Sequence, residues 1–183
     1  MLFDAKDVTV TVVPAPVCFH LVGVRYFAQG FMRADVEGSI KDGEPVFHRV
    51  NVGEVGFADG WHELVSELSS IPDSIPIAIS SFGAGELIGK ELLRHRPNVV
   101  LIKDLGQMER DNRYASLPSR TIHRMAESSD YELRLALLNM LEINPLGQWQ
   151  VKHHEREKAL AIFMACSDFY RDLDDGLIFK TEG

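Results

Sequence analysis

The sequence lacks the features that define several protein classes. Its 183 residues include only two cysteines, Cys18 and Cys166, and the absence of a CxxC pair excludes a thioredoxin-like redox motif and a CxxC zinc site. We expect two buried free thiols in a reducing compartment. No apolar run approaches the ~20 residues that cross a bilayer, and the acidic start lacks the basic residues of a secretory signal. The sequence therefore predicts a cytoplasmic protein without a membrane partner.

Positive charge is also scarce, because 19 Lys and Arg residues face 27 Asp and Glu residues, for a net charge of −8. This balance disfavours DNA as a partner, since contacts with phosphates supply most non-specific affinity for nucleic acids. The charge is uneven, however. Residues 86–124 hold 8 basic against 5 acidic side chains and lie between two acidic segments. An anionic ligand is therefore expected near the middle of the chain.

A hydrophobic content of 45% is enough for a packed core, and the first third of the chain has the patterns of strands. Residues 8–12 alternate apolar and polar side chains, and residues 17–27 are rich in β-branched and aromatic residues. Residues 31–40 and 45–52 flank Asp42-Gly43, a pair that is typical of a tight hairpin turn. The sequence predicts an N-terminal antiparallel meander, in which His20 and His48 are core or cross-strand histidines.

The middle of the chain has the pattern of a βαβ unit. Asp59 is placed to cap a helix over residues 60–70. Two short apolar runs, residues 75–80 and 98–104, flank an amphipathic helix at 84–95, as in a parallel crossover with both sheet faces covered.

Helical patterns dominate the last third. Helices are predicted at residues 118–127, 130–142 and 148–173, with a closing strand near the C-terminus. The fold class is therefore α+β, or mixed α/β. The predicted division is an α/β core domain at residues 1–104 and a helical subdomain at 105–183 packed on it, with a single domain over 1–183 as the alternative.

The stretch SSFGAGELIGK, residues 80–90, joins the first apolar run to its helix and has three glycines, Gly83, Gly85 and Gly89. Glycines at a strand-to-helix turn allow a phosphate to approach the amides at the helix start. Asp104 ends the next strand, 21 residues after Gly83, where an acid binds a ribose in dinucleotide sites. The pattern predicts a ligand site at Gly83, Gly85, Gly89 and Asp104, against a favoured alternative in which the stretch is a purely structural strand-to-helix turn with Gly89 for close packing.

Residues 116–127, SLPSRTIHRMAE, resemble the recognition helix of helix-turn-helix DNA-binding proteins. This resemblance implies outward contacts with phosphates and bases from one helix face, with Ile122 and Met125 facing inward. The outward side chains would be Ser119, Arg120, His123 and Arg124. Together with Arg110 and Arg113, the residues Arg120, His123 and Arg124 are the predicted anion or nucleic-acid contacts.

No catalytic or metal-binding constellation is recognisable, and the residues identify no cofactor. The leading hypothesis is a non-enzymatic binding protein that contacts another protein or a second copy of itself and takes a small anionic or nucleotide ligand at residues 83–89. The alternatives are a DNA-associated regulator that uses residues 116–127 and a nucleotide-dependent enzyme at the same glycine loop.

Overall fold

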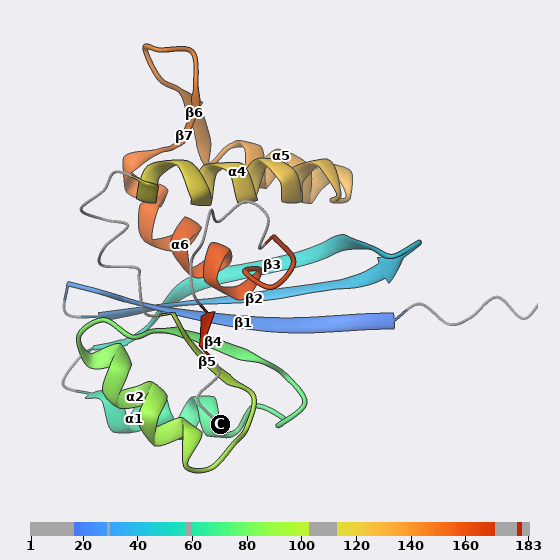
Figure 1. Cartoon of the computed structure of the whole chain (residues 1–183). Helices are drawn as coiled ribbons and strands as arrows, with labels where there is room; N and C mark the ends of the chain where they lie inside the picture. Colours follow the sequence, from blue (N-terminus) through green and yellow to red (C-terminus); the bar gives the residue numbers. More distant parts are fainter. Residues whose placement is uncertain (1–16, 29, 58–59, 103–112, 171–178, 181–183) are drawn as a thin grey trace, which may run out of the picture.

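The structure is built on one mixed β-sheet with helices on both faces (Figure 1). This computed structural model describes residues 17–28, 30–57, 60–102, 113–170 and 179–180. The six strands lie in the order β3-β2-β1-β4-β5-β8. Their bounds are β1 Val17–Phe27, β2 Gly30–Lys41, β3 Glu44–Phe57, β4 Ile77–Ser80, β5 Val99–Ile102 and β8 Phe179–Lys180. Because β1 pairs antiparallel with β2 and parallel with β4, it joins the meander to the βαβ unit.

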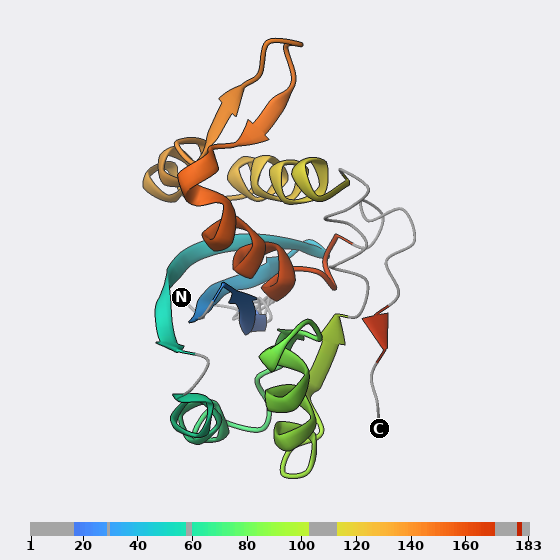
Figure 2. The same ribbon diagram turned by 90° about the vertical axis from the view of Figure 1, so that its left-hand side faces the viewer.

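The helices divide between the two faces of this sheet (Figures 1 and 2). One apolar cluster packs α1 (Trp61–Ser69) and α2 (Ala84–Leu93) on one face. A second cluster packs α4 (Arg113–Glu127), α5 (Tyr131–Leu138) and α6 (Arg156–Ala165) on the other. The predicted α+β class, with its meander, βαβ unit and helical last third, is confirmed. None of the helices in the described part of the chain is long and apolar enough to cross a membrane.

The hairpin predicted at Asp42-Gly43 is present between β2 and β3. Both turn residues have positive φ, 53° at Asp42 and 80° at Gly43. A two-residue hairpin turn needs this left-handed backbone, which Asp and Gly tolerate better than most residues. The βαβ unit is also confirmed, because β4 and β5 pair in parallel.

The helix predicted at residues 148–173 is confirmed only over α6 (Arg156–Ala165), and its first part is wrong. The chain instead forms a two-stranded hairpin of β6 (Leu141–Ile143) and β7 (Trp149–Val151), then the short 3₁₀ helix η2 (His153–Glu155) and α6. Gly147 turns the hairpin with φ of 76°, and the Asn144 side-chain oxygen accepts hydrogen bonds from the Leu146 and Gln148 amides at 2.9 Å. The helix predicted at 130–142 ends earlier, at Leu138, and the chain enters β6 at Leu141.

Two further predictions concern residues of which the structure says nothing. The strand at residues 8–12 and the capping residue Asp59 both lie outside the described residues. The N-cap of α1 is Gly60, which makes no side-chain capping bond. The division at residue 104 into a core domain and a helical subdomain stays a prediction.

A buried arginine fixes the connector between α1 and β4. Arg96 is only 3% exposed and follows α2. Its guanidinium donates to four backbone carbonyls at distances of 2.8 to 3.0 Å, that of Leu68 in the last turn of α1 and those of Ile71, Pro72 and Ile75 in the connector. Burial lowers the pKa of Arg96, while the nearby Asp73 opposes that change. The carbonyls gain a donor that a buried loop would otherwise lack.

The central strand meets α6 at Gly23. A Cβ atom built at Gly23 would lie on the backbone carbonyl oxygen of Ala161 and 2.6 Å from the amide nitrogen of Ala165. Backbone atoms of α6 thus occupy the space of a side chain, and the small residues Ala161 and Ala165 keep the contact close. Only glycine fits at this crossing.

We expect Gly23→Ala to lower the free energy of unfolding by about 1–3 kcal/mol, because a helix backbone cannot move aside as a flexible side chain can. Urea denaturation followed by circular dichroism measures this effect. Gly53→Ala is the matched control, since a Cβ there meets no heavy atom within 4 Å. An equal loss of stability in both variants would contradict the packing explanation.

The expectation of two buried thiols holds for Cys166 only. Cys166 follows α6 and is fully buried, whereas Cys18 near the start of β1 is exposed. Burial raises the pKa of the Cys166 thiol well above its ordinary value.

A thiol reagent such as dithionitrobenzoate should therefore modify one cysteine rapidly in the native protein and both in guanidinium, since the thiolate is the reactive form. The Cys18→Ser variant should lose the rapid phase. Rapid modification of Cys166 in that variant would show that the core around α6 opens readily.

Candidate nucleic-acid interface

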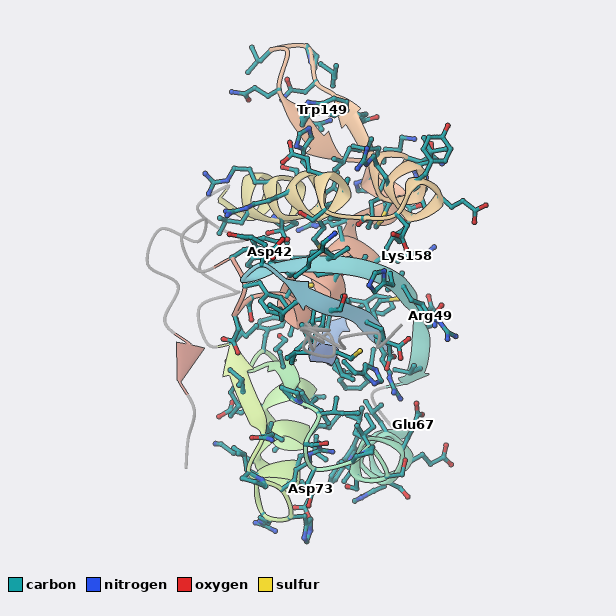
Figure 3. The ribbon with its side chains drawn as sticks, turned by 90° about the vertical axis from the view of Figure 1, so that its right-hand side faces the viewer. Asp42, Arg49, Glu67, Asp73, Trp149 and Lys158 are labelled. Carbon is teal, nitrogen blue, oxygen red and sulfur yellow. The ribbon has the colours of Figure 1, made fainter. Side chains whose placement is uncertain are left out.

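The sequence-predicted basic helix and the unpredicted hairpin form a cavity of about 500 Å³. We call it the α4–β7 pocket. Its walls come from the exposed side of α4 and from the start of β7, which contacts α4 directly. Figure 3 shows Trp149 where the hairpin leaves the body of the molecule. The lining residues are Ser119, Arg120, His123, Arg124, Glu127, Gln148 and Trp149.

The pocket combines an aromatic surface with positive charge. Trp149 is 45% exposed, and its ring centroid lies 5.7 Å from that of His123. Arg120 and Arg124 lie one turn apart on α4, so their guanidinium groups face the same side of the helix. The lining carries two arginines against one acid, Glu127, which lies 3.5 Å from His123 Nδ1. An anionic ligand with a flat ring suits this combination.

Arg124 contacts an aromatic side chain from the segment that follows α6. Its guanidinium carbon lies 5.1 Å from the centre of the Tyr170 ring. Tyr170 is 4% exposed, and burial raises the pKa of its hydroxyl. This cation–π contact restricts the side-chain conformations of Arg124 and so positions its guanidinium at the pocket.

The prediction for α4 is therefore right in part. Ile122 and Met125 are fully buried, as expected of the inner face. Arg120 is exposed and His123 and Arg124 are partly exposed, again as predicted. Ser119 is wrong, because it is 1% exposed. The reason is that α4 is covered by α5, α6 and β7 together, so its solvent face is narrower than that of a recognition helix.

The remaining predicted site residues do not come together at one site in the described part of the structure. Asp104 and Arg110 lie outside the described residues, and Arg113 begins α4 with a side chain that is not described. Arg120 and Arg124 do not surround the glycine loop, because α4 and α2 cover opposite faces of the sheet (Figures 1 and 2). The pocket and the loop are therefore separate sites.

Each glycine of the loop has a packing role. Gly83 precedes α2 with φ of 58°, and a side chain there would meet the ring of Tyr26. A Cβ at Gly85 would lie on the Ser80 carbonyl oxygen, and one at Gly89 would lie on Leu101. These contacts bring α2 close to β4 and β5, as the structural alternative requires.

The start of α2 also has its own charged pair. Glu86 lies in the first turn, where it interacts favourably with the helix dipole, and Lys90 binds it at 2.7 Å. Phe82, which is 50% exposed, contacts the Tyr26 ring beside the turn. A ligand at Gly83, Gly85 and Gly89 stays a prediction. Among the described residues, no three His, Cys, Asp or Glu side chains form a group that could hold a metal ion.

Comparison with known proteins identifies a fold but no family. No protein-family model matches the sequence, and a search of curated proteins finds no match. The structure is similar to the crystal structure of the large terminase nuclease from thermophilic phage G20c, with a TM-score of 0.50 over 83% of each chain. Only 10% of the residues are identical. The similarity therefore shows a shared fold and leaves the chemistry to the residues of this chain.

Proposed function

We propose that this protein binds single-stranded DNA at the α4–β7 pocket. The observation that carries the proposal is the gathering of Arg120, His123 and Arg124 with Trp149 around one cavity. Proteins that hold single strands without sequence preference stack bases on aromatic side chains and bind phosphates with basic ones. The similar structure is that of a nuclease, which agrees with a role on nucleic acid but rests on the fold alone.

A single strand fits the pocket better than a duplex does. A recognition helix enters the major groove with an open face, whereas α4 has Ser119 and Thr121 buried in addition to its apolar side. The hairpin contacts α4 along its outer side and leaves a cavity of about 500 Å³, a size suited to a base and its phosphates. Bases that are already unpaired can reach Trp149 without the energy cost of opening a duplex.

The net charge of −8 limits affinity and makes it depend on the local arginines. Phosphates would approach Arg120 and Arg124, while Glu127 beside His123 disfavours a second phosphate on that side. Binding is then expected to be weak at physiological salt and to show little sequence preference. The role is that of a nucleic-acid-associated protein, with no cleavage step assigned to the pocket.

The hypothesis of a protein partner stays a prediction with one observation in its favour. Four large apolar side chains on α5 and the β6–β7 hairpin are more than half exposed. Single exposed apolar residues are common on protein surfaces, whereas groups of them often mark a site of protein–protein contact. The four residues are Tyr131, Leu135, Ile143 and Leu146.

The affinity for single-stranded DNA should fall as the salt concentration rises, and the slope of this fall gives the number of phosphate contacts. For two contacts, a plot of log K against log salt concentration should have a slope of about −1.4 for a single strand. Fluorescence anisotropy of labelled oligothymidylate measures this slope. Either Arg120→Ala or Arg124→Ala should halve it, and the double variant should abolish binding.

Arg94→Ala is the control for those variants, because Arg94 is an exposed arginine that caps the C-terminal end of α2, on the other face of the sheet. Unchanged binding by the double variant would refute the site. Equal affinity for thymidine monophosphate would assign the pocket to a free nucleotide, and tighter binding of a duplex would favour the recognition-helix alternative.

Stacking on Trp149 should be visible in its fluorescence. The chain has two tryptophans, so Trp61→Phe leaves Trp149 as the only one. Oligothymidylate should quench this emission, and Trp149→Ala should weaken binding by about 1–3 kcal/mol, roughly 5- to 150-fold in Kd. Quenching that persists only in the Trp149→Phe protein would place the strand near Trp61 instead.

A further inference from the structure

Three polar side chains form a hydrogen-bonded chain at the outer edge of the sheet, away from the α4–β7 pocket. Ser39 Oγ lies 2.9 Å from His48 Nε2. His48 Nδ1 lies 3.1 Å from Asp130 Oδ2. Ser39 belongs to β2, His48 to β3, and Asp130 is the residue before α5. We call this chain the Ser39 relay.

A break in strand pairing turns His48 toward the edge. Glu37 pairs with Arg49 and Gly38 pairs with Phe47, so His48 is an extra residue on β3 without a partner on β2. A bulge of this kind bends the strand and redirects a side chain, and bulges are frequent beside active sites. Figure 3 shows the neighbouring Arg49 on the outer strand, between the two helical layers.

Backbone contacts bring the third member to the same place. The Phe47 amide donates to the Ser128 carbonyl at 2.9 Å, and Phe47 also forms a bridge with Ser129. The next residue, Asp130, is the N-cap of α5 but makes no side-chain capping bond. Aspartate at this position ordinarily accepts a bond from the first turn of its helix. Its carboxylate lies on His48 instead.

The direction of these hydrogen bonds is set by the groups themselves. A carboxylate only accepts, so the Asp130 oxygen requires the proton of a neutral His48 on Nδ1. Nε2 then carries a lone pair and accepts the hydroxyl proton of Ser39. The order is therefore nucleophile, base and orienting acid, which is the arrangement that activates serine in unrelated hydrolases.

The relay reaches a space that a substrate could occupy through His48, while Ser39 lies next to the lining residue Gly38. His48 lines a cavity of about 820 Å³ on the open part of the sheet, together with His20, Glu37 and Arg49. The far wall is the segment Ser74–Pro76 before β4. Arg49 is the cationic side chain on this side, where charge develops on a carbonyl oxygen during acyl transfer, and its Nε lies 3.6 Å from a carboxylate oxygen of Glu37, which partly offsets that charge.

We propose that Ser39 is an activated nucleophile that hydrolyses esters of small carboxylic acids. Ser39 Oγ attacks the carbonyl carbon while its proton passes to His48 Nε2. The imidazolium returns this proton to the leaving alkoxide as the carbon–oxygen bond breaks. Water, deprotonated by His48, then attacks the acyl-serine, and Ser39 leaves with a proton, so that ester and water become acid and alcohol.

The exposure of the relay limits its rate. The side chains of His48 and Asp130 are 47% and 63% exposed, so water screens the support that the carboxylate gives to the imidazolium. A modest rate is expected, well below that of hydrolases with a buried acid. The activity is independent of DNA binding, because no residue of the relay lines the α4–β7 pocket.

The decisive experiment is covalent labelling of the full-length protein with a fluorophosphonate, followed by peptide mass spectrometry. The label is expected on Ser39. Cys18 lies directly opposite Ser39 on β1 and its exposed thiol also reacts with esters, so every protein in the test carries Cys18→Ala. Absence of label on Ser39, or label on another serine alone, overturns the proposal.

Hydrolysis of p-nitrophenyl acetate gives the second readout. Ser39→Ala should remove the activity, and Asp130→Asn should lower it roughly tenfold or more, because the amide can hold His48 in the wrong tautomer. Ser70→Ala is the control, since the Ser70 hydroxyl donates to a backbone carbonyl and faces no histidine. Wild-type rates in both relay variants, or a loss of folding stability without any labelling, would leave only a structural tie between β3 and α5.

Discussion

The close approach of α6 to β1 at Gly23 supports most of the structure. β1 is the strand through which the antiparallel and parallel halves of the sheet are joined. Because the α6 backbone rests on Gly23, the helix lies near enough for Ala161, Ile162 and Ala165 to be buried against the strands. α4 packs on α6, and β7 packs on α4. The position of the α4–β7 pocket therefore depends on Gly23, a residue of the central sheet that does not line the pocket.

The two proposed sites are positioned by different features of the same fold. The α4–β7 pocket depends on tertiary packing, since its arginines come from α4 and its tryptophan from β7, two elements that are separate in the sequence and pack on each other. The Ser39 relay depends on the edge of the sheet, where an unpaired residue can reach both a neighbouring strand and the start of a helix. One site offers charge and an aromatic face, and the other offers a nucleophile with an acceptor for its proton.

The sequence predicts the elements whose signal is local. The Asp42-Gly43 turn and the two apolar runs of the βαβ unit follow from residue types that few other structures accept. The start of the helix predicted at 148–173 was wrong because the apolar, alanine-rich α6 dominates the pattern, whereas strands of three residues are too short to show alternation.

Site residues were likewise predicted only where their signal is local in the sequence. Arg120, His123 and Arg124 were predicted from helical spacing, but Ser119 was not correctly placed, because its burial depends on neighbours that the spacing does not reveal. Trp149 was missed because its contact with His123 exists only after the hairpin forms. Asp130 lies 82 residues from His48, and no motif relates them.

Arg96 has a consequence for how the molecule opens. Its single guanidinium holds four carbonyls spread from Leu68 in the last turn of α1 to Ile75 in the connector, while its backbone continues from the end of α2. Fraying of α2 from its C-terminal end would withdraw the donor from all four acceptors at once. The α1–β4 connector and the last turn of α2 therefore form one cooperative unit, which exchanges its amide protons together and not segment by segment.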